Sequence, residues 1–184
     1  EMDNAQTSRG KPCVHVVFPG WVVDMLPAYL VNLAYHLVAA SPPVPESCRI
    51  RALVLLGEMG EHLARGQEMD VAPTRREADA AELLECYALK SGSLFAAALA
   101  GGALLCGAGD AEAAALRAAG LKLGQAYQIL DDIADGPEED RAFRDAGRCT
   151  AWTLFGPEAA RVRAQELLDE VARDLDRFGA AAAP

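Results

Sequence analysis

The sequence predicts an all-α fold, and three observations support this prediction. Apolar residues recur at helical spacing in several long segments, whereas strand-like alternation never persists for more than a few residues. Alanine is abundant and β-branched residues are few outside short patches, a composition that favours helix. With 184 residues, of which 52% are hydrophobic and 24% charged, the chain is long enough to bury the core of one helical domain.

The first 70 residues of the chain are predicted to pass from a loop into two helices. Glycine and proline residues make 1–20 a loop. An apolar helix is expected over 21–40, with a kink at Pro27. The proline-rich segment 41–45 should then form a rigid connector, and the next helix should begin at residue 46 and end at residue 70.

The middle of the chain is predicted to be mostly helix. Thr74 is expected to cap a long helix, or a pair of helices, that runs to about residue 106. Ser91-Gly92-Ser93 should loosen this helix. A turn over 107–110 leads into the next helix, which is expected to end at residue 135 because Gly136-Pro137 cannot continue it.

The last quarter is predicted to be an irregular, charged stretch over 136–156 followed by a final amphipathic helix over 157–178. Pro157 suits the first turn of that helix. The tail over 180–184 should fray.

Composition excludes several classes of protein. The net charge of −10 argues against a nucleic-acid partner, because phosphates need clusters of lysine and arginine. Five cysteines without a C-x-x-C pair indicate reduced thiols and an intracellular location. No apolar run of 18 or more residues without polar interruption predicts a membrane span. The three scattered histidines do not predict a metal site, and G-x-S-x-G, H-E-x-x-H and P-loop motifs are missing.

Three carboxylates close the helix that ends at residue 135. Asp131, Asp132 and Asp135 are three or four residues apart, so all three can line one face. They lie at the C-terminal pole of the helix, where anions are unfavourable and a counter-charge is needed. Mg²⁺ supplies such a charge, since it takes a few carboxylates together with substrate phosphates. The alternative is a solvated acidic helix end.

Four segments of the chain form a pattern whose order and spacing are distinctive. They are Arg9-Gly10-Lys11-Pro12-Cys13-Val14-His15, Gly66-Gln67-Glu68-Met69-Asp70, Lys90-Ser91-Gly92-Ser93-Leu94-Phe95 and Gly124-Gln125-Ala126-Tyr127-Gln128-Ile129-Leu130-Asp131-Asp132-Ile133-Ala134-Asp135. They resemble, in this order, the R-R-G-x-P-x-x-H, G-Q-x-x-D, K-T-G-x-L-F and G-x-x-F-Q-x-x-D-D-x-x-D motifs of the trans-prenyltransferases, the isoprenyl diphosphate synthases. The resemblance covers nearly the whole chain.

The resemblance implies a fold, an activity and a set of partners. The fold is an isoprenoid-synthase-type helical bundle around a central apolar cavity, with 1–184 as one domain and the later part of a longer chain. The implied activity is that of a short-chain isoprenyl diphosphate synthase of the geranyl, farnesyl or geranylgeranyl type. Such an enzyme condenses isopentenyl diphosphate with an allylic diphosphate and uses Mg²⁺. A homodimer, or a heterodimer with a homologous subunit, is implied in the cytoplasm or a plastid, and residues 96–105 are a candidate interface.

The resemblance also implies metal-binding and catalytic residues. Asp131, Asp132 and Asp135 would bind Mg²⁺, and Asp3 would close a first aspartate-rich motif. The catalytic residues would be Lys90, Gln128 and Asp131. On the sequence alone, replacing Asp131 and Asp132 together is expected to abolish transfer and leave the fold intact, because it relieves like-charge repulsion.

Substrate-binding residues follow from the same motifs. Lys90 and Ser91 would hold the allylic diphosphate, and Arg9 would hold the homoallylic diphosphate. His15, which falls on the histidine of the motif, would be a further substrate-binding residue, and Gln128 would line the cavity. Arg148 would add positive charge near the leaving diphosphate. For Lys90 the alternative is a surface lysine whose aliphatic stem lies along the helix.

Departures from the motifs leave two other functions open. Ser8 replaces the first arginine of R-R-G, Pro27-Ala28-Tyr29 replaces the G-D-A segment, and arginines replace lysines after the second aspartate-rich motif. These changes favour a weakly catalytic or non-catalytic partner subunit of a prenyl diphosphate synthase. A terpene cyclase on a related helical fold is the second alternative.

Overall fold

The computed structural model describes residues 6–8, 10–71, 79–145 and 149–182. The chain divides into two compact units, residues 1–42 and 43–184, and each is treated by itself below. Helices make up nearly all of the described part, so the predicted all-α class is confirmed. The prediction of one domain stays a prediction.

The first unit begins with a short hairpin where a loop was predicted. Strands β1 (Thr7–Ser8) and β2 (Lys11–Pro12) pair antiparallel. Gly10 lies in the turn with a φ of 74°, a left-handed conformation that glycine adopts at little cost. Helices α1 (Val14–Val17) and α2 (Gly20–Ala39) follow, and α2 continues through Pro27.

Two helical stretches are long and apolar enough to cross a membrane by length and composition alone. They are Gly20–Ala39 and Ala80–Leu105. Both stretches contain polar residues, whereas the prediction from the sequence concerns apolar runs without polar interruption. A third of the second stretch is buried inside its own unit, as in the core helix of a bundle.

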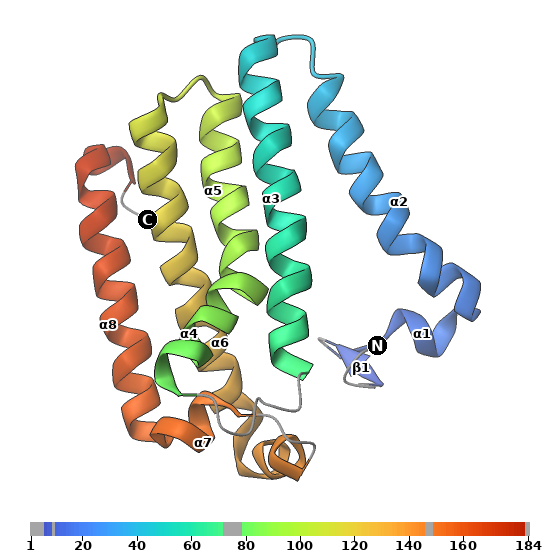
Figure 1. Cartoon of the computed structure of the whole chain (residues 1–184), viewed down its shortest axis with the longest axis vertical. Helices are drawn as coiled ribbons and strands as arrows, with labels where there is room; N and C mark the ends of the chain where they lie inside the picture. The colour runs from blue at the N-terminus through green and yellow to red at the C-terminus, as the bar shows by residue number, and fades with distance from the viewer. Residues whose placement is uncertain (1–5, 9, 72–78, 146–148, 183–184) are drawn as a thin grey trace. The chain divides into compact units, whose positions relative to one another are not determined.

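The second unit is a helical bundle in which α5 packs between α3 and α6, and α6 packs between α5 and α8 (Figure 1). Its helices in chain order are α3 (Glu46–Val71), α4 (Ala80–Tyr87), the π-helical turn η2 (Ala88–Gly92), α5 (Ser93–Leu105), α6 (Asp110–Asp145), α7 (Ala151–Phe155), α8 (Pro157–Leu175) and the 3₁₀ segment η3 (Asp176–Ala182).

Glycines allow α6 to pack so closely against η2 and α5 that their backbones are in contact. A Cβ added to Gly124 would lie less than 3.0 Å from the backbone of Gly92. A Cβ on Gly120 would meet the backbone of Ala96 equally closely. The sequence places these small residues one helical turn apart on each helix, so the two backbones can touch along two turns.

The core of the second unit lies in two clusters. The larger joins α4, α6, α7 and α8 through residues such as Leu83, Ile129 and Leu167. The smaller joins α3, α5 and the start of α6 through Leu55 and Leu104. Beside the smaller cluster is a cavity of about 400 Å³ with an apolar floor, and no predicted site residue lines it.

The start of α4 differs from the prediction. Helix α4 begins at Ala80 because Asp79 and Glu82 form a reciprocal capping box. The predicted cap, Thr74, lies outside the described residues.

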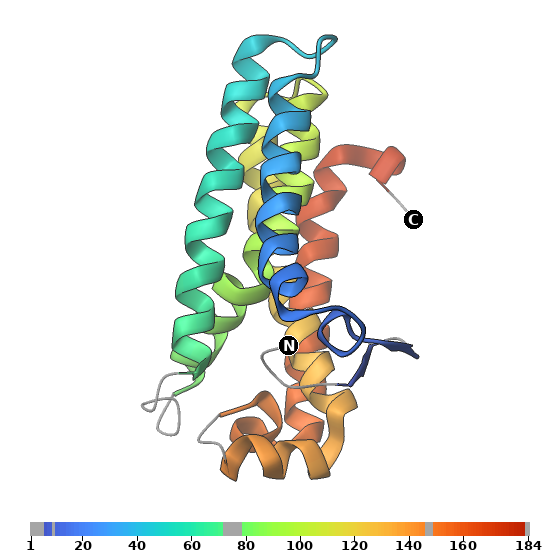
Figure 2. The same cartoon turned by 90° about the vertical axis from the view of Figure 1, so that its right-hand side faces the viewer.

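The segment after Gly136 is helical, so the prediction of an irregular stretch from residue 136 is wrong. Gly136 has a φ of 75°, which ends the straight part of α6 as predicted. The chain then resumes a helix up to Asp145, and this part leaves the axis of the preceding helix (Figure 2). Pro137 fits such a restart, since proline is favoured in the first turn of a helix.

Candidate functional site

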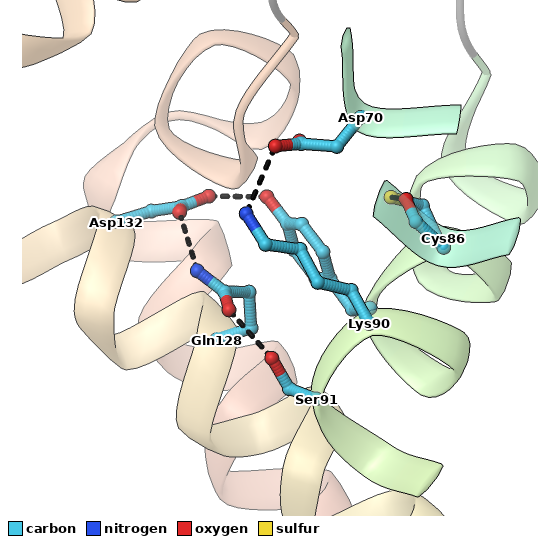
Figure 3. A network of polar contacts seen from close by, with 8 residues as sticks. Asp70, Cys86, Lys90, Ser91, Gln128 and Asp132 are labelled. Carbon is cyan, nitrogen blue, oxygen red and sulfur yellow. Dashed lines mark hydrogen bonds and ion pairs between the residues drawn. The ribbon is translucent and has the colours of Figure 1, made fainter. Parts of the chain in front are cut away.

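A polar cluster gathers at the end of the bundle where α3, η2 and α6 meet (Figure 3). Lys90 and Ser91 are neighbours in η2, and they reach two different helices. The Nζ of Lys90 lies 2.9 Å from Oδ2 of Asp70 on α3. The Ser91 hydroxyl donates to Oε1 of Gln128 on α6 at 2.7 Å. The cluster therefore joins three segments that are distant in the sequence.

Asp132 continues this cluster toward the core. Its side chain is 7% exposed, and its Oδ2 accepts from the Tyr87 hydroxyl and, at 2.7 Å, from the backbone N–H of Ala151. Its Oδ1 lies 3.5 Å from Nε2 of Gln128. Both carboxylate oxygens thus face groups of the protein, and Asp132 links α4, α6 and α7.

Burial raises the pKa of Asp132 above its ordinary value, because removal from water disfavours the charged carboxylate. The hydrogen bonds from Tyr87, Ala151 and Gln128 lower the pKa, and the neighbouring charge of Asp131 raises it further. The net direction is upward, so this buried carboxyl holds its proton more tightly than an exposed aspartate does.

Asp131 and Asp135 differ from Asp132 in exposure. Asp131 is exposed and Asp135 is half-buried, and they lie one helical turn apart. The structure therefore separates the three aspartates, which were expected to share one face: the inner one packs against Tyr87, and the outer two stay nearer the surface.

The outer pair fits a hard divalent cation in its donor chemistry. Two carboxylates one turn apart, completed by substrate phosphate oxygens and water, are a usual Mg²⁺ environment. Within the described residues, no group of three or more histidine, cysteine, aspartate or glutamate side chains is placed to hold a metal ion. A cation bound by Asp131 and Asp135 would therefore draw its remaining ligands from elsewhere. A role for Asp132 as a ligand stays a prediction.

Two glycines from the sequence motifs set the geometry of η2. A Cβ on Gly66 of α3 would lie less than 3.0 Å from the backbone of Lys90, and one on Gly124 of α6 would collide with Gly92. The backbones of α3 and α6 therefore pack directly against the backbone of the π-turn. A side chain at either position would need space that a neighbouring backbone already occupies.

Four other predicted site residues lie outside the described part of the second unit. Asp3, Arg9 and Arg148 lie outside the described residues. His15 lies in the first unit, on α1, where it lines a cavity of about 390 Å³.

Sequence reasoning missed three members of the cluster. Tyr87 stands three residues before Lys90, one turn away on the same helix, so its position was a usable signal. Asp70 closes a quoted motif but received no role. Ala151 contributes only its backbone N–H, and no residue type signals such a contact.

Comparison with known proteins agrees with this fold. The model of the polyprenyl synthetase family matches residues 2–174. A geranylgeranyl diphosphate synthase from Pseudescherichia vulneris is 32% identical over 180 residues, which cover 95% of this chain and 58% of that protein. A geranylgeranyl diphosphate synthase from Pantoea ananas is 28% identical over 178 residues, 95% of this chain and 59% of that protein.

Solved structures show the same architecture. An FPP/GFPP synthase from Zymomonas mobilis superposes with a TM-score of 0.83 at 28% identity, over 98% of this chain and 64% of that chain. A geranyltransferase from Helicobacter pylori, complexed with magnesium and isoprenyl diphosphate, gives a TM-score of 0.83 at 26% identity, over 98% and 62% of the two chains. The present chain spans somewhat more than half the length of the curated relatives named above.

Proposed function

Because the chain belongs to the polyprenyl synthetase family, we propose that it acts as a short-chain isoprenyl diphosphate synthase. The reaction would join isopentenyl diphosphate to an allylic diphosphate of the geranyl, farnesyl or geranylgeranyl series. The allylic C–O bond breaks and diphosphate leaves with the electron pair. The double bond of isopentenyl diphosphate then forms the new C–C bond, and a proton is lost from the adduct.

One observation supports this proposal above the others. Lys90, Ser91 and Gln128 meet at one end of the bundle, with Asp131 and Asp135 at the end of the straight part of α6. A cation, a hydroxyl and an amide beside paired carboxylates suit the binding of a metal diphosphate.

Asp131 and Asp135 are the residues proposed to hold Mg²⁺, with Asp132 and Asp3 as further candidate ligands. The ion would supply Lewis-acid stabilisation of the negative charge that develops on the leaving diphosphate. The protein's own acidic character fits this use, because carboxylates and diphosphate repel one another without a cation between them.

Lys90 is proposed to bind the allylic diphosphate through its ammonium group. In the described structure that group pairs with the carboxylate of Asp70. On substrate binding, the diphosphate would replace this carboxylate as the partner of Lys90. Ser91 and Gln128 would donate to phosphate oxygens, and Arg148 would add charge to the leaving group. Arg9 is the proposed ligand of isopentenyl diphosphate, and His15 is proposed as a further substrate-binding residue.

Self-association is proposed on the resemblance to the family, either with a second copy or with a homologous subunit. Part of the candidate face over 96–105 packs within its own unit: Ala96, Ala97, Ala100 and Leu104 are buried there. Ala98 and Gly102 stay exposed on the same helix and are the part of this face open to a partner. An intracellular location, in the cytoplasm or a plastid, is proposed with it.

The direct test is an assay with isopentenyl diphosphate, each allylic donor and Mg²⁺. We expect a longer isoprenyl diphosphate as product, and loss of turnover when EDTA removes the metal. Mass spectrometry of the products identifies the chain length. Absence of any product with every donor would contradict the proposal.

A non-catalytic partner subunit is the second candidate, favoured by Ser8 at the position of an arginine and by Pro27-Ala28-Tyr29 in place of G-D-A. The Ser8→Arg variant separates the two functions. Arginine grips a diphosphate through two charge-assisted hydrogen bonds, each worth about 1.5–3 kcal/mol. One such bond realised in the transition state gives roughly a 10- to 100-fold rise in kcat/KM.

Wild type and Ser8→Arg should be assayed alone and mixed with an active homologue. Turnover by the wild type alone, increased in the variant, supports the synthase. No turnover in either protein, together with a changed product profile of the homologue on mixing, identifies the partner subunit instead.

A further inference from the structure

The π-helical turn η2 has a hydrogen-bond register that differs from the helices around it. In an α-helix, the N–H of Ser93 would bond to the carbonyl of Leu89, four residues back. Here it donates to the carbonyl of Ala88, five residues back. The Leu89 carbonyl instead accepts from the Ser93 side chain, with 2.6 Å between Oγ and O. The hydroxyl thus takes the place of the backbone donor that the register shift withdraws.

Ser93 is 3% exposed, so its hydroxyl has no access to bulk water. A buried hydroxyl needs a partner. The Leu89 carbonyl is that partner for Ser93. Serine is unremarkable in a helix interior, but at this position its side chain compensates for the register of the turn.

A π-turn spans one more residue than an α-helical turn, and this changes the directions in which the neighbouring side chains point. Adjacent residues in a helix do not face the same side. The turn directs Lys90 to Asp70 on α3 and Ser91 to Gln128 on α6 (Figure 3). Single π-turns inside α-helices occur frequently at functional sites. Return of residues 88–92 to an α-helical register would rotate these side chains relative to Asp70 and Gln128.

We infer that Ser93 is a positioning residue: its hydroxyl holds the π-turn that presents Lys90 and Ser91 to the diphosphate. This inference rests on the proposed function for the identity of the ligand. Ser93 does not itself touch the ligand. The Ser93 hydroxyl holds the backbone at Leu89, and this backbone sets the orientation of Lys90 and Ser91.

The test compares four substitutions in the whole chain. Ser93→Ala removes the donor, and Ser93→Cys keeps nearly the same volume with a much weaker donor. Ser93→Thr keeps the hydroxyl, which in threonine also reaches the carbonyl one turn back. Ser47→Ala is the control, because Ser47 is exposed on α3.

Binding of inorganic diphosphate in the presence of Mg²⁺, measured by titration calorimetry, is the first readout. Ser93→Ala and Ser93→Cys should each bind about 3- to 10-fold more weakly, the range that one hydrogen bond gives. Ser93→Thr and Ser47→Ala should bind as the wild type does. Tight binding by both Ser93→Ala and Ser93→Cys would overturn the inference.

Amide hydrogen exchange at position 93 is the second readout, and it needs no ligand. The N–H of residue 93 should exchange about tenfold faster in Ser93→Ala and Ser93→Cys than in the wild type and Ser93→Thr. If the wild type binds no diphosphate, the proposed function fails while this measurement still decides the role of Ser93. Equal protection in all four proteins would show that the turn holds without the hydroxyl.

Discussion

The Asp132→Ala variant is expected to lose about 1–3 kcal/mol of unfolding free energy, because the buried Tyr87 hydroxyl then lacks its acceptor. The Ala151 N–H also bonds to Oδ2 of Asp132, and in the variant it would keep only its 3.1 Å bond to the Tyr87 oxygen. Tyr87 is 3% exposed and Ala151 is fully buried, so water cannot replace the lost carboxylate. Burial of the Asp132 carboxylate itself costs free energy, and the alanine variant does not have this cost. The loss of unfolding free energy is therefore smaller than the lost hydrogen bonds alone would give.

The expectation from the sequence was the opposite, namely that replacement of Asp131 and Asp132 together leaves the fold intact. It rested on like-charge repulsion at a helix end, a contribution of only about 0.2–0.5 kcal/mol per pair. The structure adds the larger contribution of the hydrogen bonds to Asp132, and we therefore expect the double variant to be destabilised.

Asp131→Ala is the matched variant for this experiment. Asp131 is exposed, so its replacement should change the unfolding free energy by less than about 0.5 kcal/mol. If Asp131 holds Mg²⁺ as proposed, the same change should lower kcat/KM at least 100-fold, since a metal ion contributes several kcal/mol of charge stabilisation.

Urea denaturation measures the first effect and the prenyl transfer assay measures the second. Asp132→Asn keeps one oxygen as an acceptor and should lose less stability than Asp132→Ala. Equal stability of Asp131→Ala and Asp132→Ala would contradict the structural role given to Asp132. Wild-type turnover in Asp131→Ala would remove Asp131 from the metal site.

Gly124→Ala is expected to destabilise the second unit by about 3 kcal/mol or more. Its new methyl group would lie less than 3.0 Å from the backbone of Gly92 and of Ser91. Overpacking usually costs about 1–3 kcal/mol, and here the obstacle is backbone rather than a movable side chain. The helices must separate, so the hydrogen bond between Ser91 and Gln128 should be lost as well.

Gly102→Ala provides the control, since nothing lies within 4 Å of a Cβ at that helical position. Alanine favours helix over glycine by about 0.5–1 kcal/mol, so this variant should be slightly more stable than the wild type. Thermal or urea unfolding of both variants compares them directly. A Gly124→Ala protein as stable as Gly102→Ala would mean that α6 does not touch η2 at backbone distance.

The sequence by itself determined the helical class, the approximate extent of most helices and the residue types of the site. Apolar residues at helical spacing and the glycine and proline stops are local signals, and they placed the end of straight α6 at Gly136. The segment Ser91-Gly92-Ser93 was recognised as a weak point of its helix, and the π-turn ends there. Motif order supplied the family.

The tertiary structure alone decided how each helix is rotated and which side chains meet. Helical spacing fixes the angles between Asp131, Asp132 and Asp135, but it leaves open which of them faces the core. The packing of α6 against α4 and α7 settles this, because Tyr87 and Ala151 place donors beside Asp132. The same holds for Lys90, whose partner Asp70 is 20 residues away in the sequence and adjacent only after α3 packs on η2.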